Sequence, residues 1–129
     1  EDLGVFDLVT GLDLLEHIYE EDLDRFMENV RPSVGKYVFF DICTSRNPPK
    51  DTFVHKKGEP VPIYYEWIAV AGHVNVRPFG WWIDYLESTG WRIEWRIMST
   101  FEHQRAWHPE MSKVAAWSGI NTICASLTV

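Results

Sequence analysis

Two acidic residues and a histidine lie close together near the start of the chain, in "FDLVTGLDLLEHIYEEDLDRF". They are Asp13, Glu16 and His17. An imidazole titrates near neutral pH, so His17 is a candidate catalytic base that a neighbouring carboxylate could orient. The alternative is structural: Glu16 and His17 cap the start of a helix, while Asp13 bonds a backbone amide.

Three further polar residues are candidates for binding a substrate. His73 and Asn75 alternate in "GHVNV", so they lie on one side of the chain if this segment is extended. They could line a pocket together with Asp13 and Glu16, or they could satisfy backbone groups of a loop. Asp41 ends an apolar run, where it is either a pocket residue or a turn former.

The remaining histidines and the tryptophans carry weaker signals. His103 and His108 have no third ligand at a suitable spacing, so the sequence assigns no metal ligands. Four tryptophans favour packing of the core over a stacking surface. They are Trp81, Trp82, Trp91 and Trp95.

The elements that position these residues follow from periodicity. Residues 5–12 are short and apolar, as in a strand, and an acidic helix start follows. Leu23, Phe26, Met27 and Val30 form one apolar stripe that Pro32 ends. Residues 35–44 are almost continuously apolar, which is typical of a strand buried in a parallel sheet.

The second half of the chain contains two long polar or aromatic stretches. Residues 44–77 predict a long loop or insertion, since no period is visible there. Pro78 and Gly90 delimit a second helix, residues 91–99 alternate as an edge strand does, and residues 120–129 predict a last strand. This order predicts an α/β three-layer sandwich whose ligands bind beyond the carboxyl ends of the strands, where the cluster of Asp13, Glu16 and His17 lies.

Composition excludes several classes of protein. The chain has 129 residues, 46% of them hydrophobic, which is enough for one packed domain. A net charge of −7 argues against nucleic acid as a partner. The two cysteines lie in apolar runs and suggest no disulfide scaffold. No apolar run predicts a membrane span or a signal peptide, so we expect a cytoplasmic protein.

Several stretches of the sequence, taken together in their order, resemble the carboxyl-terminal half of a class I S-adenosylmethionine-dependent methyltransferase. "FDLVTGLDLLEH" resembles the family's fourth strand and its exit, and "RPSVGKYVFFDI" resembles the approach to the fifth. The resemblance implies a Rossmann-like fold with a mainly parallel sheet and an antiparallel C-terminal strand inserted between the second and third strands of this chain. It implies that residues 1–129 are the C-terminal part of a single domain, with a substrate-side insertion at about 44–77.

The resemblance also implies a function. The family's glycine-rich turn would lie upstream of Glu1, so the chain looks like a fragment that by itself binds S-adenosylmethionine weakly and is inactive; its cofactor-binding residues stay unassigned. The expected reaction is methyl transfer to a small molecule, with His17 as base and Asp13, Glu16, Asp41, His73 and Asn75 on the substrate side. The alternatives are half of a nucleotide-binding oxidoreductase and a non-catalytic Rossmann-like interaction module.

Within that resemblance, one group of methyltransferases is closer at the cluster. Asp13, Glu16 and His17 resemble the acidic-x-x-Glu-His cluster of the ubiquinone-pathway O-methyltransferases, which holds a divalent metal. In this chain the first acid is Asp instead of Glu. The Leu-Glu-His part also occurs in relatives without a metal, so both possibilities stay open.

Overall fold

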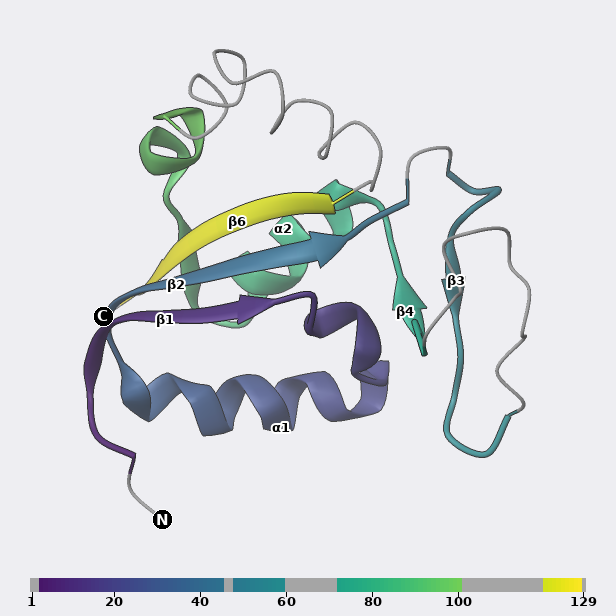
Figure 1. Cartoon of the computed structure of the whole chain (residues 1–129), viewed down its shortest axis with the longest axis horizontal. Coiled ribbons are helices and arrows are strands. Elements are labelled where there is room, and N and C mark those ends of the chain that lie inside the picture. Colours follow the sequence, from purple (N-terminus) through teal and green to yellow (C-terminus); the bar gives the residue numbers. More distant parts are fainter. Residues whose placement is uncertain (1–2, 46–47, 60–71, 101–119, 129) are drawn as a thin grey trace.

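The first third of the chain forms a strand, a helix and a second strand. The computed structural model describes residues 3–45, 48–59, 72–100 and 120–128. Strand β1 (Phe6–Leu12) is followed by a 3₁₀ turn, η1 (Leu15–His17), helix α1 (Glu20–Val30), a second 3₁₀ turn, η2 (Arg31–Ser33), and strand β2 (Val34–Cys43). β1 pairs in parallel with β2, so the strand-helix-strand unit predicted from periodicity is confirmed (Figure 1).

Helix α1 forms where the apolar stripe predicts it. Leu23 and Met27 are buried, and Phe26 and Val30 pack against the same core. Three acidic residues occupy the first turn, where the positive end of the helix dipole favours them. The helix gives way to η2 at Arg31, directly before Pro32, which has no amide hydrogen to continue the ladder.

The second half of the chain adds the other strands of the main sheet. Helix α2 (Phe79–Ser88) begins after Pro78 and ends before Gly90, whose φ is +93°. Strands β5 (Trp91–Ile93) and β6 (Ile120–Leu127) follow, and the strand order of the sheet is β1-β2-β6-β5. β6 is antiparallel to both β2 and β5. The predicted insertion of the C-terminal strand between its two neighbours is therefore confirmed.

The predicted Rossmann-like three-layer α/β sandwich with a mainly parallel sheet is wrong. Among the described strands, β1 and β2 form the only parallel pair, because β6 enters the middle of the sheet and makes two antiparallel pairs. The described helices are few and short, and α1 and α2 contact each other through a 2.8 Å hydrogen bond from Tyr85 to Asp24. Both pack in one core with alternate residues of β2, so they form one layer instead of two (Figure 1).

The stretch 44–77 contains a small sheet that the sequence does not predict. Strand β3 (Phe53–Val54) pairs antiparallel with β4 (Asn75–Val76), two residues against two. Strands this short leave no periodic signal. Residues 60–71 of the predicted insertion lie outside the described part. No helix in the described part is long and apolar enough to cross a membrane.

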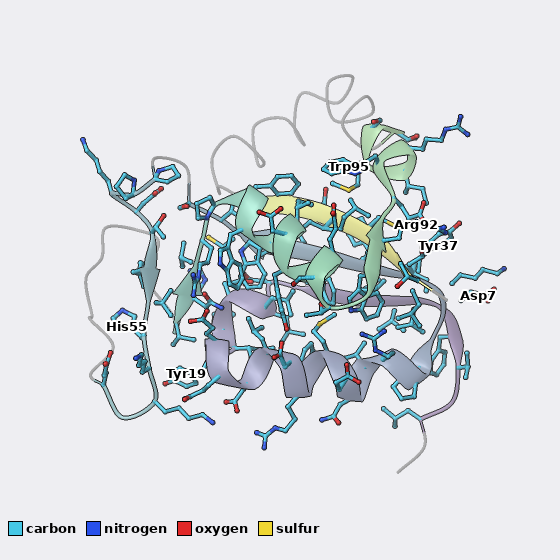
Figure 2. The ribbon with its side chains drawn as sticks, turned by 180° about the vertical axis from the view of Figure 1, so that it is seen from behind. Asp7, Tyr19, Tyr37, His55, Arg92 and Trp95 are labelled. Atoms are coloured by element: carbon cyan, nitrogen blue, oxygen red, sulfur yellow. The ribbon has the colours of Figure 1, made fainter. Side chains whose placement is uncertain are left out.

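The tryptophans divide between core and surface. Trp82 and Trp91 are almost completely buried, as predicted, whereas Trp95 is 53% exposed. The strand predicted over 91–99 ends at Ile93, and residues 95–100 are helical, which turns Trp95 outward (Figure 2). The charged residues that alternate with apolar ones in this stretch therefore do not mark one extended strand.

Gly11 is required by close packing at the end of β1. A Cβ atom there would lie 2.8 Å from Cδ1 of the Phe40 ring, which is itself buried. We expect Gly11→Ala to lower the free energy of unfolding by about 1–3 kcal/mol, because the ring must shift in a packed core. Gly80→Ala is the matched control: no atom lies within 4 Å of that Cβ, and alanine favours the helix by about 0.5–1 kcal/mol. Urea unfolding of both variants tests this, and equal effects would contradict it.

Candidate active site

The site begins at the turn that follows β1. Asp13 has a φ of +52°, in the left-handed region that few residues other than glycine adopt, although aspartate tolerates it. Its amide donates a 2.9 Å hydrogen bond to the carbonyl of Asp41, at the end of the neighbouring strand. The chain therefore leaves the sheet at Asp13 and enters η1, which presents Glu16 and His17. Backbone conformations of this kind are concentrated at functional sites.

Four side chains converge at this turn. Asp13, Glu16, His17 and His73 each offer one oxygen or nitrogen atom, and these atoms all lie within 4.8 Å of one another. His17 Nε2 is 3.9 Å from Asp13 Oδ1, and the rings of His17 and His73 meet edge to face with centroids 4.7 Å apart. Three of the four residues come from the predicted local cluster, and the structure brings His73 to them from another part of the chain.

The ring of His17 is held in one orientation. Its Nδ1 lies 3.1 Å from the carbonyl oxygen of Gly72. Because a carbonyl only accepts hydrogen bonds, Nδ1 carries the proton, and Nε2 is then the nitrogen that can accept one. Neither η1 nor α1 has a hydrogen bond from a side chain at its N-cap, so no such bond supports the capping role considered for Glu16 and His17.

Backbone hydrogen bonds fix the segment that supplies His73. The amide of Val74 donates to the carbonyl of Glu16 at 2.9 Å, and the amide of His55 donates to the carbonyl of Val74 at 2.8 Å. The segment is thus tied to η1 on one side and to the small sheet on the other. These bonds lie next to His73, between Gly72 and Val74, and hold the segment at the cluster.

Burial and mutual proximity set the charges of the two carboxyl groups. Glu16 is completely buried, and loss of water, with Asp13 beside it, raises its pKa to about 8. A hydrogen bond from the protonated Glu16 lowers the pKa of Asp13, and the nearby His17 and His73 act in the same direction. At neutral pH the pair therefore shares one proton, and the negative charge resides on Asp13, which is the exposed member.

The four side chains also fit a divalent metal ion. Glu16 is buried beside Asp13, and the backbone amides of Glu16 itself and of Cys43 are the other groups that act on its carboxyl group. A buried acid is costly unless it holds a proton or binds a cation. Ligand bonds of about 2.0–2.2 Å place two ligands of one ion up to about 4.4 Å apart, so small side-chain movements would bring these four onto one ion.

The other predicted site residues lie outside this cluster. Asn75 is buried, and its side-chain oxygen accepts a 2.9 Å hydrogen bond from Arg77. Asp41 contributes its backbone carbonyl to the turn, and its carboxylate is not one of the four clustered groups. His103 and His108 lie outside the described residues. The sequence reasoning missed Gly72, whose carbonyl orients His17; its only signal is its place beside His73.

Comparison with known proteins found no matching family model, no matching curated protein and no matching solved structure.

Proposed function

We propose that this chain forms the acceptor side of an S-adenosylmethionine-dependent methyltransferase that acts on a small molecule. The observation that carries the proposal is the convergence of His17, Asp13, Glu16 and His73 at the end of β1. Methyl transfer needs an aligned acceptor and, where the acceptor is a hydroxyl group, a base to take its proton. His17 is oriented for that role, with Nε2 able to accept the proton.

Each residue of the cluster has a defined part in this proposal. His17 Nε2 removes the proton of the acceptor, and Asp13, 3.9 Å away, stabilises the imidazolium that results. His73 restricts the ring of His17 on its other side. When bound, S-adenosylmethionine supplies an electrophilic methyl group on a positively charged sulfur.

The charge of the site supports S-adenosylmethionine as the methyl donor. Asp13 is exposed, and its lowered pKa keeps it ionised at neutral pH. A carboxylate at the mouth of the site favours a sulfonium cation over an anionic ligand. The overall charge of −7 acts in the same direction and disfavours a dinucleotide, which carries two phosphates.

Ligand titration of the protein as the cell makes it tests the proposal. We expect calorimetry to show saturable binding of S-adenosylmethionine and no comparable binding of NAD or NADP. Preference for a nicotinamide dinucleotide would support the oxidoreductase instead. Binding of neither ligand would overturn the proposal and leave the non-catalytic interaction module.

A further inference from the structure

Helices α1 and α2 form an open groove of about 270 Å³ between them. The wall from α1 contains the carboxylates of Glu20 and Asp24, and the wall from α2 contains the rings of Trp81 and Tyr85. The two residues of each wall are four positions apart, so they lie on one face of their helix. The groove therefore sets two acidic groups against two aromatic rings.

A guanidinium group of the chain itself is bound at one end of this groove. The Cζ atom of Arg77 lies 4.1 Å from the ring centroid of Trp81, and its Nη2 atom lies 2.8 Å from Oε2 of Glu20. A planar guanidinium can stack on an aromatic ring and pair with a carboxylate at the same time, which a lysine ammonium does less well. The chain thus shows what a ring of α2 and a carboxylate of α1 bind together.

Tyr85 and Asp24 repeat this combination one helical turn further along. The hydroxyl of Tyr85 donates a 2.8 Å hydrogen bond to Asp24 Oδ1. Burial, together with the neighbouring Asp24, raises the pKa of Tyr85 above its ordinary value, so the hydroxyl keeps its proton at neutral pH. A carboxylate can accept several hydrogen bonds, so this one orients Asp24 and leaves room for another donor.

Asp24 differs from its neighbours on α1 in its ion pairs. Glu20, Asp24 and Glu28 follow one another at intervals of four positions. Glu20 pairs with Arg77, and Glu28 lies 3.5 Å from Arg31. Within the part of the chain that the structure describes, no ion pair includes Asp24. The middle carboxylate of the row therefore keeps its negative charge beside an aromatic ring.

The surface around the groove is strongly acidic. Helix α1 contains five acidic residues and one basic residue, and α2 contains two acidic residues and no basic one. The two helices thus account for six of the seven net negative charges of the chain. A field of one sign that extends along two helices attracts a partner with several positive charges and speeds its association.

We propose that the groove between α1 and α2 binds an arginine side chain from a basic segment of a partner protein. The guanidinium stacks on the ring of Tyr85 and pairs with Asp24, as Arg77 is held at the neighbouring turn. A protein segment fits better than a small cation, because the acidic surface extends along both helices beyond the groove. The proposal is independent of methyl transfer, since none of these residues belongs to the cluster after β1.

Titration with peptides of defined composition tests this inference. We expect a fluorescently labelled peptide in which arginine alternates with glycine to bind saturably, as measured by anisotropy. The same peptide with citrulline, which has nearly the shape of arginine without its charge, should not bind. A lysine peptide should bind at least about threefold more weakly, because an ammonium has no planar group to stack. Equal binding of the arginine and lysine peptides, or free arginine that binds as tightly as the peptide, would overturn the inference.

Two charge variants locate the binding site. Asp24→Asn should weaken binding of the arginine peptide about tenfold or more, because a charged hydrogen-bond partner is lost. Glu87→Gln is the matched control, since it removes one charge from an exposed position of α2 outside the groove. It should weaken binding less than about threefold. An equal loss in both variants would mean that the peptide responds only to overall charge, and would overturn the groove as its site.

A measurement on the unmutated protein covers the case in which Asp24→Asn fails to fold. In NMR spectra of the aromatic rings, the arginine peptide should shift the signals of Tyr85 and Trp81. The signals of Trp95, which is exposed and does not line the groove, should stay unchanged (Figure 2). Signals of Tyr85 that do not respond to the peptide would overturn the inference.

Discussion

Replacing His17 with alanine is expected to lower the turnover of the protein as the cell makes it by a factor of roughly 100 to 10,000, the usual cost of losing a general base. Its melting temperature should change little. The reason is the geometry of the ring: its one hydrogen bond, to the carbonyl of Gly72, is in a partly exposed position and contributes only about 1 kcal/mol. Steady-state kinetics and a thermal melt on the same preparation measure both quantities.

The control for this variant is His55→Ala, which removes an imidazole from the neighbouring small sheet and leaves the cluster intact. That variant should keep the rate of the unmutated protein. A normal rate with a lowered melting temperature for His17→Ala would leave His17 with a structural role only.

The metal-free protein is expected to lose stability as the pH rises from 5 to about 8. The pKa of Glu16 is about 8 in the folded chain, above its ordinary value of 4.5, so the folded state binds this proton more tightly than the unfolded state does. Its contribution to stability is fully present below pH 4.5 and is lost as the pH rises through 8, by on the order of 5 kcal/mol. The lowered pKa of Asp13 changes the stability only at pH values below its ordinary pKa of 3.8, which is outside the range from pH 5 to 8.

Glu16→Gln separates this effect from the titration of other groups. The glutamine has nearly the same shape and no proton to lose, so the difference in unfolding free energy between the variant and the parent should grow from pH 5 to pH 8. Urea unfolding in the presence of a chelator at several pH values measures it. A difference that stays constant over this range would contradict the assignment of the buried acid.

Much of the main sheet follows from local patterns. The stripe of Leu23 and Met27 locates α1, and Pro78 and Gly90 delimit α2, because helix ends depend on residues that are adjacent in sequence. The number of layers could not be predicted in this way. The apolar stripe of a helix shows that the helix covers a sheet but not which face of the sheet it covers. In this chain α1 and α2 cover the same face.

The site was only partly predictable for a similar reason. Asp13, Glu16 and His17 stand together in the sequence, so their proximity needs no tertiary information. His73 was a candidate for a pocket, but its contact with His17 depends on the hydrogen bond between Val74 and Glu16. The complete burial of Glu16 also depends on tertiary packing, and a glutamate directly after a leucine pair carries no local sign of it.

The most direct test of the account is a methyl-transfer assay on the protein as the cell makes it. It would be incubated with S-adenosylmethionine that carries a radioactive methyl group and with a fraction of small metabolites from cells. We predict that label appears in the low-mass fraction and that His17→Ala abolishes nearly all of it. Label that appears in protein or nucleic acid instead, or no transfer by a protein that binds the donor, would contradict the account.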